Sequence, residues 1–184
     1  VVAFAGTAAV VQAPTTSRED VIAAIDRFQL QRATATGSGI ILSLATIFPD
    51  AGIEISQATG QKSMPGPIDE KKDKKEFTPV EPGSYTSAAI IMLTDGARTT
   101  GPDPLEAAKM AADRGVRVYT VGIGTVAGET IGFEGWSMRV RLDEAALKQV
   151  ALMTLAEYLY AGSAQDLMKV YQSLSSKLVV EKKE

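Results

Sequence analysis

Apolar residues recur along this chain at two different spacings, and each spacing predicts one kind of element. Short runs rich in β-branched residues predict strands, whereas apolar residues three or four positions apart predict helices. Strands are expected over residues 1–5, 7–13, 87–94, 116–123 and 157–160. Helices are expected over about 18–30, 40–48, 104–114, 144–152 and 164–174. Strand and helix alternate from residue 87 onwards, which is typical of a parallel sheet with helices on both faces.

Residues at the ends of these segments agree with this assignment. Pro104 suits the first position of a helix, and Gly115 suits the position just after one. Gly6 separates the first two strands, which we expect to form an antiparallel pair. A second hairpin is expected around Gly135. Helix N-caps are expected at four residues with short polar side chains: Ser17, Asp103, Asp143 and Ser163.

Two polar regions interrupt the pattern. Residues 34–39 read Thr-Ala-Thr-Gly-Ser-Gly and are predicted to form a loop. Residues 51–84 are rich in Gly, Pro and charge, and 69–76 carry four acidic and four basic residues. Charge runs of this kind are usually solvated. We therefore expect one domain over 1–184, with a flexible insertion at 51–84 and a frayed tail at 178–184.

The residue types that are missing restrict the chemistry of this chain. The sequence contains neither Cys nor His, which excludes thiolate metal sites, imidazole catalysis and Ser-His-Asp triads. A metal would have to be held by oxygens, which favours Mg, Ca or Mn. The net charge of −3, without a large basic block, argues against nucleic acid as a partner. No apolar stretch is as long as a membrane span.

One carboxylate occupies a position typical of ligand sites. The strand expected over 87–94 is followed by Asp95 and Gly96. In open α/β sheets, ligands bind outside the carboxyl ends of the strands, and a hard cation there favours oxygen ligands. Asp95 is therefore a candidate metal ligand. The alternative is an ordinary Asp-Gly turn in which the carboxylate accepts hydrogen bonds from local amides.

Hydroxyl groups supply a second set of candidates. Thr34 and Thr36 come just before the second predicted helix, where a hydroxyl can donate an oxygen to a metal. The alternative is a helix cap, a role that fits Thr36 or Ser38. Residues 122–128 resemble a dinucleotide-binding loop, but the spacing has one residue too many and no amphipathic helix follows.

Taken together, these segments resemble the von Willebrand factor A (VWA) domain. Residues 2–16 are similar to the second and third strands of that family, and 32–37 resemble its Thr-x-x-Gly loop. Residues 90–96 and 117–124 are similar to two later strands with the residues that follow them. The likeness extends over nearly the whole chain and is greatest to bacterial membrane-anchored VWA proteins of the Bat-like, aerotolerance-type group.

The resemblance implies a Rossmann-like open, mostly parallel sheet with a metal-ion-dependent adhesion site. In the family, this site takes oxygens from an Asp-x-Ser-x-Ser motif, a Thr and an Asp. Thr34 matches the Thr and Asp95 matches the Asp. The Asp-x-Ser-x-Ser motif is absent from this sequence, because in the family it lies on the first strand, upstream of Val1. We therefore expect weak or absent Mg²⁺ or Mn²⁺ binding by this chain and full binding in a longer parent.

The absent first strand and helix also affect the sheet. A gap is expected between the strand at 1–5 and the strand at 87–94. Unpaired backbone groups buried along such a gap would each cost about 1–3 kcal/mol. A partner strand, a swapped dimer or a shifted pairing would close it.

The function implied for the intact parent is protein–protein recognition, in which a partner's Asp or Glu completes the metal shell. Bat-like relatives have membrane spans flanking the domain, so the parent is expected to be membrane-anchored, with the domain on the extracytoplasmic face. This chain is not expected to be an enzyme. Two alternatives remain open: a nucleotide-dependent Rossmann-like enzyme, and a structural VWA scaffold whose metal site is inactive.

Overall fold

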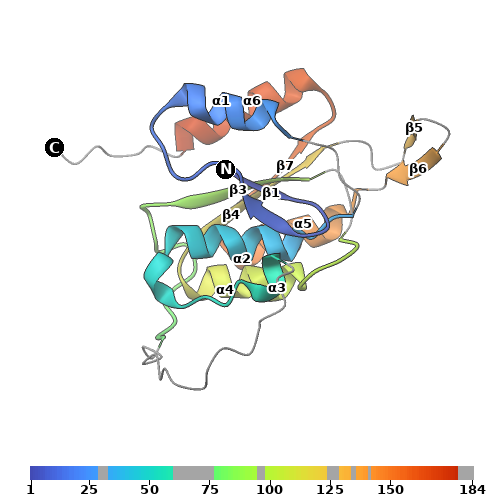
Figure 1. Ribbon diagram of the computed structural model, residues 1–184. Coiled ribbons are helices and arrows are strands. Elements are labelled where there is room, and N and C mark those ends of the chain that lie inside the picture. The colour runs from blue at the N-terminus through green and yellow to red at the C-terminus, as the bar shows by residue number, and fades with distance from the viewer. Residues whose placement is uncertain are drawn as a thin grey trace.

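A three-stranded parallel sheet forms the centre of the protein (Figure 1). The computed structural model describes residues 1–28, 33–59, 77–94, 98–123, 129–133, 136–140 and 142–177. The sheet has the order β3-β4-β7 and consists of β3 (Ala89–Thr94), β4 (Arg117–Ile123) and β7 (Tyr158–Ala161). Two antiparallel hairpins are separate from it: β1 (Val2–Phe4) with β2 (Ala8–Val10), and β5 (Glu129–Phe133) with β6 (Trp136–Val140). These pairings confirm the predicted strands.

Helices cover both faces of the sheet, as expected. In Figure 1, α1 and α6 lie on one side of the sheet, and α2, α3 and α4 lie on the other. Helix α5 packs against α4 and β4 in this second layer. The helices are α1 (Arg18–Asp26), α2 (Thr36–Ile47), a 3-10 turn (Pro49–Ala51), α3 (Ser56–Thr59), α4 (Pro104–Asp113), α5 (Glu144–Met153) and α6 (Ala164–Lys177).

The predicted helix starts are confirmed by their capping hydrogen bonds. The Ser17 hydroxyl accepts from the Asp20 amide, and the Asp103 carboxylate accepts from the Leu105 amide at 2.7 Å. Asp143 and Ser163 cap α5 and α6 in the same way. Each cap satisfies one of the backbone donors that a helix leaves unpaired at its start.

The two faces of the sheet are not covered equally. On the α2 side, Ile90 and Met92 of β3 are buried in a large core with α2, α4 and α5. On the α6 side, Ile91 and Leu93 are only half-buried against a smaller cluster that includes Val121 and Leu174. Strand β3 therefore has one well-covered face and one partly open face.

The predicted loop at 34–39 is wrong for residues 36–39, because α2 already begins at Thr36. A side chain at Gly37 would collide with the backbone carbonyl of Pro102. A Cβ at Gly39 would lie 2.8 Å from the ring of Phe4. These glycines therefore permit close packing inside a helix rather than a turn. Thr36 and Ser38 are not caps either, since the N-cap is Ala35, which makes no side-chain cap bond.

Within the described residues, β3 is an edge strand paired only with β4. No Cα atom of β1 or β2 lies within 8 Å of a Cα of β3. Helix α2 nevertheless contacts β1, β2 and β3. The separation matches the expected gap left by the family's first strand.

The insertion expected at 51–84 is described only in part. Residues 56–59 form α3, in which Ala58 is fully buried. The charged run at 69–76 and the tail at 178–184 lie outside the described residues. The single-domain assignment with its flexible insertion stays a prediction.

A buried threonine connects α5 to the central strand. Strand β7 pairs with β4 only from Thr120 onwards, so the amide of Val118 has no partner in β7. This amide donates instead to the Thr154 hydroxyl at 3.0 Å, and the hydroxyl is also 3.1 Å from the Val150 carbonyl. The Thr154 hydroxyl thus provides the hydrogen-bond acceptor that a longer β7 would otherwise offer to the Val118 amide.

We predict that Thr154→Val lowers the free energy of unfolding by about 1–3 kcal/mol, because the Val118 amide loses its acceptor in the core. Thr46→Val is the matched control, since the Thr46 hydroxyl bonds only the Leu42 carbonyl four residues earlier. It should change stability by less than about 1 kcal/mol. Urea unfolding measures both, and equal losses would contradict the role assigned to Thr154.

We predict that Gly37→Ala also destabilises the protein. In an unconstrained helix this change stabilises by about 1 kcal/mol, but here the added methyl group meets the Pro102 carbonyl, and overpacking costs about 1–3 kcal/mol. Ser43→Ala on the same helix is the control and should have little effect. Chemical denaturation tests this, and an increase in stability for Gly37→Ala would refute the close contact.

Candidate functional site

The carboxyl edge of the sheet carries the candidate site. Strand β3 ends at Thr94, and the starts of α2, α4 and α5 meet near this edge around a cavity of about 220 Å³. Residues from all three helix starts line it, together with one arginine from the loop after β3: Thr36, Arg98, Asp103, Pro104, Leu105, Asp143, Ala146, Leu147 and Val150. The cavity therefore lies where ligands bind in open α/β sheets.

Thr34 is held against the segment that follows β3. Its backbone amide donates to the Thr99 hydroxyl at 2.8 Å, and its carbonyl accepts from the Thr99 amide at 3.0 Å. The Thr100 amide points to the same carbonyl at 3.5 Å. Residue Ala33, just before Thr34, has a φ of 74°, which is unusual for a residue other than glycine. These contacts join two loops that are 65 residues apart in sequence.

The partner residue predicted from the sequence, Asp95, lies outside the described residues. Its neighbour Thr94 is 5% exposed at the end of β3. The arrangement in which Thr34 and Asp95 share a cation therefore stays a prediction. Thr36, the other hydroxyl considered, is 3% exposed in the first turn of α2 and lines the cavity.

The electrostatics of this edge are set by helix ends. The N-terminus of a helix carries a partial positive charge, and three such ends meet here. The carboxylates of Asp103 and Asp143 offset this charge at α4 and α5, whereas α2 has no side-chain cap. Arg98 forms an ion pair with Asp103 at 3.4 Å, but both side chains are more than 40% exposed. An exposed pair of this kind contributes only about 0–1 kcal/mol.

The described residues do not make a complete metal site. Among them, no three Asp, Glu, His or Cys side chains gather closely enough to hold a metal ion. The Asp103 and Asp143 carboxylates are already engaged as helix caps. A hydroxyl such as that of Thr34 is an oxygen donor that Mg²⁺ and Mn²⁺ accept, but it needs carboxylates beside it.

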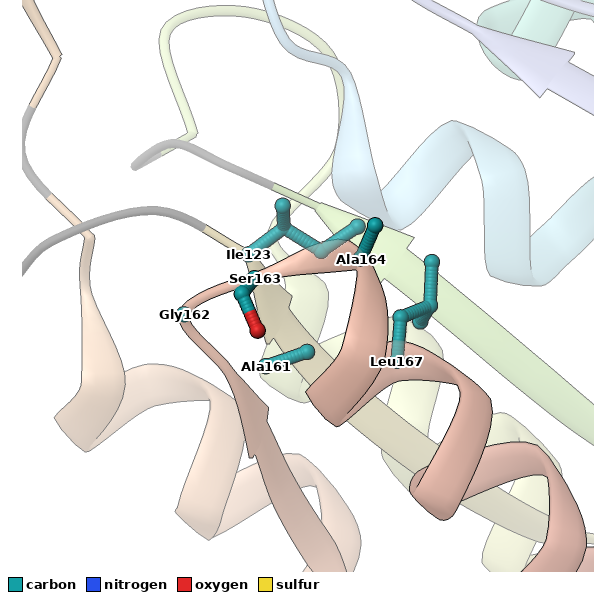
Figure 2. Close-up of a pocket in the computed structure, with 6 residues that line it drawn as sticks. All are labelled: Ile123, Ala161, Gly162, Ser163, Ala164 and Leu167. Carbon is teal, nitrogen blue, oxygen red and sulfur yellow. The ribbon is translucent and has the colours of Figure 1, made fainter.

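A second cavity, of about 320 Å³, was not predicted from the sequence. It lies between the carboxyl end of β4 and the start of α6 (Figure 2). Ile123, Ala161 and Leu167 give it a largely apolar wall, and the nearby Ser163 hydroxyl is engaged with Asp166. The small residues at 162–164, which follow β7, gave no indication in the sequence that a cavity would form there. Among the described residues that line the cavity, Ser163 has the one polar side chain.

The weak dinucleotide-binding hypothesis gains no support. Residues 124–128 lie outside the described part of the chain, but the next described element after β4 is the strand β5. A pyrophosphate site would require a helix N-terminus there. Gly122 has a packing role instead, because a Cβ at this position would lie 2.7 Å from the Tyr158 hydroxyl.

Comparison with curated proteins identifies bacterial relatives. No family model matches the chain. It is 31% identical over 194 residues to a UPF0353 protein of Nocardia farcinica, and 33% identical over 186 residues to one of Mycobacterium sp. (strain KMS). The two alignments cover 98% of this chain but only 50% and 48% of those proteins. The chain thus spans about half the length of the curated relatives it matches.

Solved structures with the same fold include two from Bacteroides. The conserved hypothetical protein BatB of Bacteroides thetaiotaomicron has a TM-score of 0.67 at 21% identity, covering 96% of this chain and 77% of that one. An aerotolerance-related membrane protein of Bacteroides fragilis has a TM-score of 0.64 at 19% identity, with the same coverages of 96% and 77%. Neither name describes an enzyme.

A third structural neighbour carries the metal motif. It is proximal thread matrix protein 1 of the mussel byssus, with a TM-score of 0.56 at 19% identity, covering 94% of this chain and 32% of that one. Zinc occupies the MIDAS motif of that protein. The strand order, the two helical layers and these neighbours agree with one another. The chain therefore has the von Willebrand factor A-type fold of the Bat-like bacterial proteins.

Proposed function

We propose that this domain recognises other proteins through the loops at the carboxyl edge of its sheet, using a Mg²⁺ or Mn²⁺ ion in the intact protein. The coarser role, a VWA adhesion-type module, agrees with the fold neighbours, one of which has a zinc-occupied MIDAS motif. The finer role, metal-dependent binding of a protein, rests on the arrangement of the Thr34 loop.

The observation that carries this proposal is the pair of hydrogen bonds between Thr34 and Thr99. Thr99 is only four residues after Asp95 in sequence. A segment of four residues spans at most about 14 Å when fully extended. Asp95 also directly follows Thr94, the last residue of β3. Both constraints allow the Asp95 carboxylate to lie close to the Thr34 hydroxyl.

In the proposed site, the Thr34 hydroxyl and the Asp95 carboxylate each present an oxygen to the cation. The bound ion would supply a positive charge that attracts an acidic group of the partner. An Asp or Glu of that partner is the expected ligand, because a charge-assisted contact is stronger than a neutral one. The further oxygens come from residues outside this chain, so the 184 residues alone are expected to bind metal weakly or not at all.

The residues around the site would determine which partner fits. Arg98 lies within the loop after β3 and is 41% exposed, so it is available to a second acidic group. Residues 97–102 and 124–140 are the loops proposed to set specificity. A partner rich in Asp and Glu fits this surface better than a nucleic acid does.

We also propose that the intact protein is anchored in a bacterial membrane, with this domain on the extracytoplasmic face. The support is that one fold neighbour is described as a membrane protein. In the described part of the chain, the helices are all too short or too polar to cross a bilayer.

We predict that the full-length protein binds Mn²⁺ and that Asp95→Ala and Thr34→Val each weaken this binding at least about tenfold, because each removes one oxygen donor. Water proton relaxation in the presence of Mn²⁺ measures the affinity. Asp103→Asn is the matched control, since it removes a neighbouring carboxylate but retains a good helix cap.

Equal losses for Asp103→Asn and Asp95→Ala would show that general negative charge attracts the ion, and would contradict a specific site. Metal binding that is unchanged in both Asp95→Ala and Thr34→Val would favour the scaffold with an inactive site.

We predict that neither NAD nor ATP raises the melting temperature of the full-length protein, whereas Mn²⁺ raises it. A ligand that binds only the folded state stabilises the protein by RT ln(1 + L/Kd), where L is the free ligand concentration. A thermal-shift experiment with each compound alone distinguishes these cases. A shift with a nucleotide and none with Mn²⁺ would replace the proposed function with the enzyme alternative.

A further inference from the structure

The start of α2 is buried but carries no cap. Its first turn is buried throughout and consists of Thr36, Gly37, Ser38 and Gly39. The N-cap residue, Ala35, has a methyl side chain that accepts no hydrogen bond, and the turn contains no acidic residue. The first amides of a helix have no acceptor within the helix itself, so a buried helix start needs an acceptor from elsewhere.

The part of the chain that the structure describes does not supply this acceptor. Gly39 donates to the Ala35 carbonyl at 3.2 Å, but the amides of residues 36–38 donate to no described atom. The hydroxyl of Thr36 forms no hydrogen bond with a described residue either, although this residue is only 3% exposed. The buried hydroxyl of Ser38 also has no partner among the described residues. Buried donors of this kind are costly unless a ligand or a water satisfies them.

The cavity of about 220 Å³ at the carboxyl edge of the sheet reaches this turn, because Thr36 is one of its lining residues. Arg98, Asp103 and Asp143 also line it, and the remaining lining is apolar and includes Leu147. Sites for drug-sized ligands measure about 300–1,000 Å³. This smaller cavity therefore suits a small molecule or the end of a peptide.

The charges around the cavity favour an anion. The carboxylates of Asp103 and Asp143 each accept from an amide at the start of their own helix, so they offset the positive ends of α4 and α5. The positive end of α2 is not offset in this way, and Arg98 adds a full positive charge. Arg98 is 41% exposed and 3.4 Å from Asp103, so its guanidinium is free to bind a second carboxylate.

The same lining favours a carboxylate over a phosphate or a sulfate. Asp103 and Asp143 would repel a dianion about twice as strongly as a carboxylate, because the Coulomb energy scales with the charge. The apolar side chains of Leu147 and Val150 offer nothing to additional oxygens but pack well against an aliphatic group. A carboxylate on a short aliphatic chain suits both the polar end and the apolar wall.

We propose that this cavity binds a carboxylate that carries a short aliphatic chain. Its oxygens accept hydrogen bonds from the Thr36 hydroxyl and the first amides of α2, and they pair with Arg98. A small organic acid and the carboxyl terminus of a peptide share this chemistry. The binding needs no metal ion, and Thr34 does not line the cavity. The inference therefore goes beyond the proposed metal-dependent function and fails separately from it.

The test titrates sodium butyrate into the 184-residue chain in the presence of EDTA and follows the amide chemical shifts by NMR. Saturable shifts are expected at residues 36–38 and 98–105. Butyrate should bind at least about tenfold more tightly than its neutral analogue butyramide, because a charge-assisted hydrogen bond is about twice as strong as a neutral one. Sodium chloride at equal ionic strength controls for screening.

Two further ligands distinguish the possible sources of the carboxylate. Acetyl-alanyl-alanine and its C-terminal amide are titrated under the same conditions. Binding of the free acid but not of the amide would support a peptide carboxyl terminus, whereas butyrate binding without peptide binding would support a small organic acid. Inorganic phosphate should bind more weakly than butyrate.

Substitutions test the assigned contacts. Thr36→Val should weaken butyrate binding at least about fivefold. Thr46→Val on the same helix is the matched control and should leave the affinity unchanged, since its hydroxyl bonds only the Leu42 carbonyl. Without butyrate, Thr36→Val should not lower the melting temperature, because the hydroxyl that it removes has no described partner. Asp143→Asn retains a good helix cap but removes a negative charge, so it should strengthen butyrate binding.

Several results would overturn the proposal. Equal affinities for butyrate and butyramide would show that the charge of the ligand is not recognised. Phosphate binding as tight as that of butyrate would contradict the assignment to a carboxylate. Weaker butyrate binding by Asp143→Asn, or unchanged binding by Thr36→Val, would show that the ligand does not occupy the cavity in the proposed way.

Discussion

The close approach of α2 to the loop before α4 holds the carboxyl edge of this protein together. Gly37 allows the backbone of α2 to meet the Pro102 carbonyl, and the hydrogen bonds between Thr34 and Thr99 join the adjoining loops. Thr34 and Gly37 lie just before and at the start of α2, whereas Thr99 and Pro102 belong to the connection between β3 and α4. Their contact ties the backbone of Thr34 to the segment that follows β3.

Much of the fold could be predicted from the sequence because its signals are local. Asp103 followed by Pro104 and Asp143 before α5 are capping patterns, and each cap is present. Gly37 and Gly39 misled the prediction because loops and close helix packing both select glycine. Whether a glycine serves a loop or close helix packing depends here on contacts with Pro102 and Phe4, which are distant from these glycines in sequence. Propensity alone cannot detect such tertiary contacts.

The candidate site could be predicted only as a pair of oxygen donors. The backbone of Thr34 is joined to the segment after β3, whereas its role as a metal ligand and the position of Asp95 both remain predictions. The cavity bordered by Ile123 and Leu167 could not be predicted from the sequence. A cavity depends on how separate elements pack in three dimensions, and no local sequence pattern encodes that packing. The same holds for β3, which has the composition of a central strand and lies at an edge of the described sheet.

The central claim is that Thr34 and Asp95 share one divalent cation at the carboxyl edge of the sheet. A crystal structure of the full-length protein grown with Mn²⁺, analysed by anomalous scattering, tests it most directly. The account predicts a single strong anomalous peak at this edge, bordered by the Thr34 hydroxyl and the Asp95 carboxylate. A peak elsewhere, or an Asp95 side chain directed away from Thr34, would contradict it.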